Sequence, residues 1–168
     1  MNFSQLPSDF RILIDTNKHN HLDAYNILEQ LHTRGICLTL GRPASNLKSL
    51  LNAKGISTEN LTFIDCITKK IKESKRLDDC YYANIDNFSE VFAAIDAASS
   101  EIKGKKFLIL DSLNELSMHH GYRSLIFLDF LHNMLATHNS RAIFLTNNMQ
   151  DQQIRAYIEN KCDKKIMI

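Results

Sequence analysis

The sequence has few residues that favour flexible segments and no strong excess of charge. It contains five glycines and two prolines in 168 residues, which leaves little room for a flexible linker. The net charge is +1, so no overall field attracts nucleic acid or an anionic membrane. The apolar runs reach only about five residues, far short of the ~20 that span a bilayer, which excludes membrane insertion. We therefore expect one soluble domain over residues 1–168.

Disulfide bonds and secretion are also not expected. The four cysteines are scattered without a CxxC pair, which favours reduced thiols and a cytoplasmic location. The N-terminus lacks a basic segment followed by an apolar one, so we expect no secretory signal.

Short apolar runs alternate with helical patterns along the chain. We predict strands at residues 10–15, 36–40, 61–65, 107–110 and 141–146, and a terminal edge strand at 164–168. We predict helices at residues 21–34, 43–54, 87–102, 122–138 and 151–161. This alternation predicts an α/β three-layer sandwich, in which helices cover both faces of a mainly parallel sheet.

Two segments lack such a pattern. Residues 1–9 are expected to form a loose lead-in, and residues 66–86 an irregular surface loop. The second segment contains a basic cluster: Lys69, Lys70, Lys72, Lys75 and Arg76. Such a cluster could contact nucleic-acid phosphates. No aromatic residues are interleaved and two acids follow, so we favour a solvated loop.

The chain is organised around Lys105–Leu116, KKFLILDSLNEL. Four apolar residues end in Asp111, followed by Ser112, which predicts a buried strand that delivers a carboxylate to the edge where open α/β sheets bind ligands. Asp111 could be a metal ligand there. Alternatively, Asp111 caps the following helix and Ser112 satisfies nearby amides, which is the interpretation we favour.

Phe107–Leu116 is similar to the Walker B strand of the RecA/KaiC-type P-loop ATPase core, and Leu61–Asp65 to an earlier strand of that core. The resemblance extends over about residues 10–168 in an archaeal-style single-domain form. It implies a RecA-like sheet with the order 3-2-4-5-1-6, where the six predicted strands are numbered along the chain. It also implies a magnesium-ligating role for Asp111.

The sequence departs from this family where the phosphates would bind. A P-loop needs GxxxxGK[ST], but Ile14–His21 contains no glycine, and Lys18 lacks the GK[ST] context. The family's water-polarising acid after the second strand is also missing, because the chain reads Leu40-Gly41-Arg42. The resemblance with these departures implies a degenerate member that lacks the Walker A loop, a pseudo-ATPase.

A residual nucleotide site remains an alternative. It would use Lys18, Thr16, Asp111, Ser112 and Arg42, with ATP and Mg²⁺ as ligands. The competing interpretation, which we favour, is an internal polar network that fills the vacated pocket, with Asp15 or Asp111 paired to Lys18 or Arg42. The histidine pairs at 19/21 and 119/120 lack metal-site spacing, so we expect them on surface loops.

The leading hypothesis is thus a non-catalytic RecA/KaiC-like domain that binds a protein partner or forms a homo-oligomer. It could serve as a regulatory or structural subunit of an ATPase or signalling assembly, without a cofactor. The apolar helix at 122–138 is either an interface or simply buried against the sheet, and both remain open. The alternatives are a divergent nucleotide-binding or ATP-hydrolysing protein using Asp111 and Lys18, and a nucleic-acid-binding module using the 69–76 loop.

Overall fold

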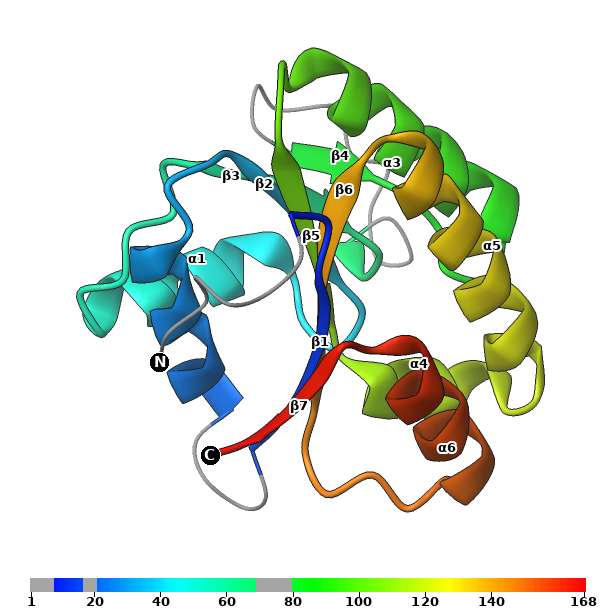
Figure 1. Ribbon diagram of the computed structural model, residues 1–168. Helices are drawn as coiled ribbons and strands as arrows, with labels where there is room; N and C mark the ends of the chain where they lie inside the picture. The colour runs from blue at the N-terminus through cyan, green and yellow to red at the C-terminus, as the bar shows by residue number, and fades with distance from the viewer. Residues whose placement is uncertain (1–7, 17–20, 69–79) are drawn as a thin grey trace.

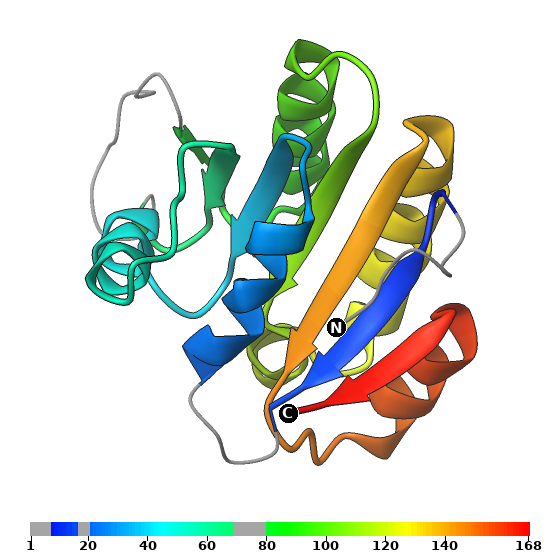
Figure 2. The same ribbon diagram turned by 60° about the vertical axis from the view of Figure 1, so that its left-hand side comes forward.

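A computed structural model describes residues 8–16, 21–68 and 80–168 (Figure 1). Within them, seven strands form one parallel sheet in the order β4-β3-β2-β5-β6-β1-β7 (Figure 2). The strands are β1 (Arg11–Asp15), β2 (Gly35–Thr39), β3 (Leu61–Asp65), β4 (Cys80–Tyr82), β5 (Lys106–Asp111), β6 (Ser140–Thr146) and β7 (Lys164–Met167).

The order of the six predicted strands, 3-2-4-5-1-6, is confirmed, and β4 adds a seventh strand at the edge beside β3. This short strand lies within residues 66–86, so the expectation of a wholly irregular loop there is wrong. β4 has three residues, too few to show a hydrophobic period, and pairs with β3 from Phe63↔Cys80 to Asp65↔Tyr82.

Helices cover both faces of the sheet, which confirms the three-layer α/β prediction (Figure 1). One face carries the 3₁₀ helix η1 (His21–Gln30) and α1 (Ala44–Ala53). The other carries α3 (Phe88–Glu101), α4 (Leu113–His120), α5 (Arg123–Thr137) and α6 (Gln152–Lys161). In the described parts of the chain, no helix has the length and apolar character to cross a membrane.

The continuous apolar strands fill both layers because their side chains alternate between the faces. In β5, Phe107 and Ile109 pack toward η1 and α1, whereas Leu108 and Leu110 pack toward the helices of the other face. All six residues of β5 are buried, as expected for a central parallel strand.

The first predicted helix differs from the structure in type and length. It is a 3₁₀ helix that stops at Gln30, not an α-helix that reaches residue 34. Gly35 is therefore not a helix terminator but the first residue of β2. The ring of Phe107 occupies the space beside it, because a Cβ at position 35 would lie 2.1 Å from Phe107 Cε2. The close packing of β2 and β5 requires glycine here.

Three strands end in a buried acid at the same edge of the sheet. Asp15 ends β1, Asp65 ends β3 and Asp111 ends β5, with exposed fractions of 2%, 2% and 5%. Parallel strands place their carboxyl ends together, so this edge contains the candidate functional site.

Candidate functional site

Both carboxylate oxygens of Asp111 are bound by side chains of η1. His21 Nε2 lies 2.6 Å from Oδ1, and the Tyr25 hydroxyl donates a 2.8 Å hydrogen bond to Oδ2. His21 and Tyr25 both belong to η1, so this one helix supplies both contacts to the end of β5. The carboxylate has its hydrogen-bond partners inside the protein.

Burial and these contacts set the ionisation states of Asp111 and Tyr25. Burial raises the pKa of Asp111, but the hydrogen bond and charge of His21, the Tyr25 hydroxyl and the charge of Arg42 outweigh it, so the pKa lies below its ordinary value of 3.8. Burial raises the pKa of Tyr25 well above 10.0, so its phenol stays a neutral donor. Asp111 is thus an ionised acceptor at neutral pH.

Tyr25 also contacts a cysteine thiol. Its hydroxyl lies 3.4 Å from Cys37 Sγ, and both residues are fully buried. Burial is the main cause that raises the pKa of the Cys37 thiol, and the nearby charge of Asp111 raises it further. A neutral, buried thiol is a poor nucleophile. Cys37 therefore acts as a core residue under this edge.

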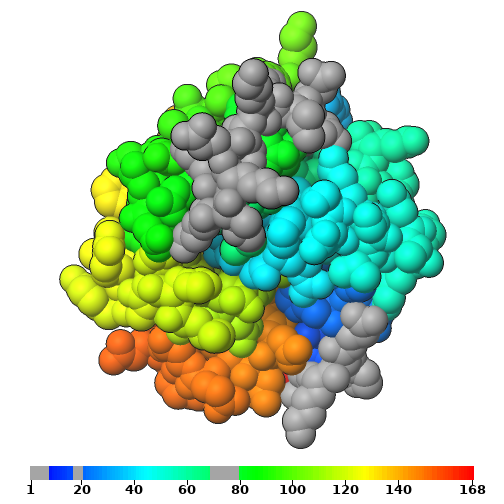
Figure 3. Space-filling view, turned by 180° about the vertical axis from the view of Figure 1, so that it is seen from behind, coloured from blue at the N-terminus to red at the C-terminus, as the bar shows by residue number. Residues whose placement is uncertain are grey.

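A cavity of about 250 Å³ lies in front of Asp111. Its lining residues come from four segments and are His21, Gly41, Arg42, Asp111, Ser112, Asn114, Glu115 and Asn147. Figure 3 views the face where the start of α1 (cyan), α4 (yellow-green) and the segment after β6 (orange) meet around the blue N-terminal residues. The cavity is smaller than the ~300–1,000 Å³ of typical small-molecule sites.

A second carboxylate, that of Glu115, lines the cavity, and the sequence pattern did not predict it there. A Cβ added at Gly41 would lie 2.8 Å from Cγ of Glu115, so this side chain of α4 packs directly on Gly41. The chain lacks an acid directly after β2, but Glu115 brings one to the same place from another element.

The structure brings together only some of the residues predicted for a nucleotide site. Arg42 and Ser112 line the cavity with Asp111. Thr16 instead donates its hydroxyl to the backbone oxygen of Thr146 at 3.3 Å, and it is fully buried. The remaining predicted residues lie outside the described parts of the chain: Lys18, Lys69, Lys70, Lys72, Lys75 and Arg76.

The expectation that Asp111 caps the following helix is wrong. The N-cap of α4 is Ser112, and no side chain makes a capping hydrogen bond there. The oxygens of Asp111 bind η1 instead. Asp111 is held by His21 and Tyr25, rather than by hydrogen bonds from Arg42.

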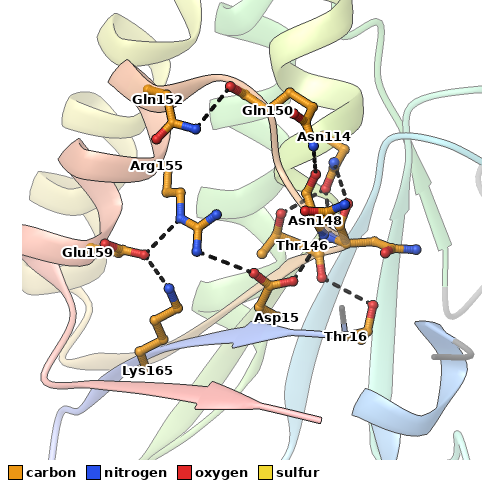
Figure 4. Close-up of polar contacts among 11 residues, drawn as sticks. Asp15, Thr16, Asn114, Thr146, Asn148, Gln150, Gln152, Arg155, Glu159 and Lys165 are labelled. Atoms are coloured by element: carbon orange, nitrogen blue, oxygen red, sulfur yellow. Dashed lines mark hydrogen bonds and ion pairs between the residues drawn. The ribbon is translucent and has the colours of Figure 1, made fainter. Parts of the chain in front are cut away.

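Asp15 belongs to a second group of internal contacts (Figure 4). Its Oδ1 accepts a 3.0 Å hydrogen bond from the Asn148 amide, and its Oδ2 lies 3.8 Å from Arg155 Nη2. Arg155 also binds Glu159 at 3.1 Å, and Lys165 binds the same Glu159 oxygen at 2.5 Å. Asp15 thus joins β1 to the segment before α6 through Asn148 and to α6 itself through Arg155.

Asp65 ties the loop after β3 to the start of α1. Its Oδ2 accepts a 2.8 Å hydrogen bond from the Ala44 amide and one of 2.7 Å from the Thr68 hydroxyl. Its Oδ1 accepts from the amides of Ile67 and Thr68, both at 2.8 Å. All three strand-end acids are therefore held by polar contacts within the described parts of the chain. The expected pairing of Asp15 or Asp111 with Lys18 stays a prediction, because Lys18 lies outside the described residues.

His21 and Tyr25 are the residues that sequence reasoning missed. His21 was expected on a surface loop, but its side chain is 13% exposed and bonded to Asp111. Tyr25 was expected only as part of an apolar helix face. A tyrosine and a histidine in one helix give only a weak sequence signal for this contact. Their shared acceptor, Asp111, lies 90 residues from His21 and 86 from Tyr25 in the chain.

Metal coordination receives no geometric support from the described residues. Among them, no three His, Cys, Asp or Glu side chains are arranged to hold a metal ion. The metal-ligand role of Asp111 stays a prediction.

A second candidate site is a surface on α5. Tyr122, Ile126 and Phe130 are 71%, 43% and 62% exposed, although all three are large apolar or aromatic residues. They follow one another at intervals of four, so they lie along one face of the helix. We call these three residues the apolar stripe. Phe127, Leu128 and Leu131 are buried on the sheet side of the helix, whereas the stripe faces outward. The role of this helix as an interface stays a prediction.

Sheet order and two helical layers define an α/β protein with a RecA/KaiC-like fold. It is similar to the KaiC-like protein PH0186 from Pyrococcus horikoshii, with a TM-score of 0.63 and 16% identity over 96% of this chain and 72% of that one. It is also similar to the uncharacterized protein PH0321 from the same organism, solved in complex with an unknown peptide. There the TM-score is 0.73 and the identity 10%, over 95% and 77% of the two chains. No protein-family model and no curated protein matches the sequence.

Proposed function

We propose that this chain is a non-catalytic RecA/KaiC-like domain that acts by binding a protein. The observation that carries this proposal is the occupation of both Asp111 oxygens by His21 and Tyr25. Nucleotide hydrolysis needs carboxylate oxygens that are available to magnesium or its water. A carboxylate bonded by its own chain on both oxygens must give up these contacts before it can serve a metal.

Two further features support the loss of nucleotide chemistry. Ile14–His21 has no glycine, and glycine amides are what hold phosphates in a P-loop. The buried Asp15 at the end of β1 adds negative charge where a phosphate would bind. A scaffold that keeps its fold without these parts suits a regulatory or structural subunit.

Protein binding is supported by the apolar stripe. Exposed apolar side chains gathered on one helix face are typical of an interaction surface. The similar structure PH0321 was solved with a bound peptide, so another protein of this fold binds a polypeptide. The stripe is the surface we assign to the partner.

Thermal unfolding with saturating Mg-ATP tests the proposal. A ligand at 100 times its dissociation constant would stabilise the folded chain by about 2.7 kcal/mol. For a chain of this size, that corresponds to a rise of roughly 5–11 °C in Tm. We expect no shift beyond the scatter between replicates, with Mg²⁺ alone as the control. A rise of several degrees that is lost in Asp111→Ala would refute the proposal.

The second candidate function is divergent nucleotide binding. The cavity supports it, because Arg42 and Glu115 line this cavity together with Asp111. This candidate predicts micromolar binding heat in titration calorimetry that disappears in Arg42→Ala. Absence of heat from the wild-type chain would dismiss it.

A further inference from the structure

A partly buried arginine at the start of β1 has a histidine as its side-chain partner. Arg11 Nη1 lies 3.1 Å from Nε2 of His132, which is 121 residues later, in α5. Arg11 shares a sheet face with Leu13, so its side chain points into the layer that contains α5 and α6 (Figure 1). Arg11 Nε is buried there and has no hydrogen-bond partner among the described residues. Within that part of the chain, His132 is thus the one hydrogen-bond partner of the guanidinium.

The contact between Arg11 and His132 requires a neutral imidazole. A guanidinium stays protonated at all pH values near neutral and only donates hydrogen bonds, so the atom that faces it must be an acceptor. Nε2 of His132 therefore carries a lone pair, and the ring proton is on Nδ1. Protonation of Nε2 removes this acceptor and places a second positive charge 3.1 Å from Arg11 Nη1.

The charged groups around His132 favour the neutral ring. β1 contributes Arg11 and α6 contributes Lys161, and both charges oppose a proton on the imidazole. The opposite charge comes from Asp129 in α5 itself, and the Tyr157 hydroxyl donates a 3.0 Å hydrogen bond to its Oδ1. Burial, then the charges of Arg11 and Lys161, outweigh Asp129, so the pKa of His132 lies below its ordinary value of 6.5.

Arg11 also holds the junction between α6 and β7. Its amide donates a 2.7 Å hydrogen bond to Asp163 Oδ2, and its carbonyl oxygen accepts a 2.8 Å hydrogen bond from the Asp163 amide. Asp163 lies between the end of α6 at Lys161 and the start of β7 at Lys164. Through Arg11, the α6–β7 junction is therefore connected to His132 and α5.

We propose that Arg11 and His132 form an acid-sensitive contact, which ties the α6–β7 junction to α5 and opens when His132 takes up a proton. This device goes beyond the proposed function and depends neither on the apolar stripe nor on the Asp111 site.

The sign of the pH effect follows from the lowered pKa of His132. The unfolded chain takes up this proton near pH 6.5, and the folded chain only at lower pH. The contact therefore contributes its full stability above about pH 6.5. The contribution declines as the pH falls from there through the folded pKa, because the unfolded chain then binds more protons than the folded one.

Nitrogen-15 chemical shifts of the histidine rings test the contact in the wild-type chain. At about pH 7.5 we expect His132 Nε2 to resonate as an unprotonated ring nitrogen and Nδ1 as a protonated one. On titration, His132 should take up its proton below pH 6.5, and Arg11→Met should move the midpoint upward. A proton on Nε2 at about pH 7.5, or a wild-type midpoint at or above 6.5, would overturn the proposal.

Urea unfolding between about pH 7.5 and 5 measures the linked loss of stability. His132→Gln keeps an acceptor oxygen for Arg11 but does not titrate. As the pH falls over this range, the unfolding constant of the wild type should rise at least ~3-fold more than that of His132→Gln. Equal pH dependence in these two chains would contradict the proposal.

His138→Gln is the matched control for this measurement. His138 directly follows α5, and its Nε2 lies 2.9 Å from a carboxylate oxygen of Asp96, so protonation does not break its contact. This variant should lose at least as much stability in acid as the wild type. A loss reduced to that of His132→Gln would show that the acid effect is not specific to His132.

Hydrogen exchange locates the opening. After correction for the intrinsic exchange rate at each pH, the amides of Arg11 and Asp163 should lose protection at least ~3-fold by about pH 5 in the wild type but not in His132→Gln. Unchanged protection of both amides in the wild type, or an equal loss in the two chains, would refute an opening at this junction.

Discussion

Replacing Tyr25 by Phe tests the contacts that close the site around Asp111. The substitution removes one oxygen and keeps the ring, so the fully buried position retains its packing. It deletes the 2.8 Å hydrogen bond to Asp111 Oδ2 and the 3.4 Å contact with Cys37 Sγ. What remains is a buried carboxylate with one oxygen lacking its donor.

The expected cost follows from the charge of the acceptor. A hydrogen bond to a charged group contributes about 1.5–3 kcal/mol, and a buried oxygen left without a donor keeps its desolvation penalty. We expect the free energy of unfolding to fall by about 2 kcal/mol. For a chain of this length that lowers Tm by roughly 4–8 °C.

Urea unfolding followed by circular dichroism measures the loss and its pH dependence. The folded pKa of Asp111 lies below its ordinary value of 3.8. Its ionised form therefore contributes stability that is present above about pH 4 and lost as the pH falls through the folded pKa. Tyr25→Phe removes one of the bonds that lower this pKa. The gap between variant and wild type should therefore be full at neutral pH and narrow below about pH 4.

Tyr157→Phe is the matched control. It also removes a phenol that donates to an aspartate, Asp129 Oδ1 at 3.0 Å, but this bond is exposed. Exposed polar pairs contribute about 0–1 kcal/mol, so the control should cost far less. If Tyr25→Phe costs no more than Tyr157→Phe, then the Tyr25 bond does not hold Asp111 and the basis for a closed site fails.

Two further substitutions test the packing around the sheet. Gly35→Ala places a Cβ 2.1 Å from the Phe107 ring and should cost about 1–3 kcal/mol in thermal melting, partly recovered by adding Phe107→Leu; an unchanged Tm would contradict the packing. Asp65→Ala leaves three amides, including that of Ala44, without their acceptor, and should cost about 2–4 kcal/mol in urea unfolding; a loss below ~0.5 kcal/mol would show that the network there is dispensable.

The strands of this chain were predictable because each is a short apolar run that stands out from its surroundings. Phe107–Leu110 and Leu61–Ile64 need no long-range information to be assigned as buried strands, and the acids that end them mark the carboxyl edge of the sheet. The resemblance of the same stretches to the RecA/KaiC core supplied the sheet order.

Other features were not predictable from local patterns. β4 has only three residues, and its strand conformation depends on its pairing with β3. The Gly35 position looked like a helix end, because nothing nearby in the sequence reveals the Phe107 ring that packs against it. Glu115 reaches the side of Gly41 from a helix more than 70 residues later.

Local sequence patterns were enough to predict the α/β class and the position of Asp111 at the end of a buried strand, and the resemblance to the RecA/KaiC core predicted the strand order. The contacts that Asp111 makes there depend on the tertiary structure. Its partners His21 and Tyr25 lie 90 and 86 residues earlier in the chain. The hydrophobic periods of strands and helices, two and 3.6 residues, describe only local structure and cannot predict a contact across that distance. Packing of η1 against the sheet brings these groups together, so both oxygens of Asp111 have a partner within the chain.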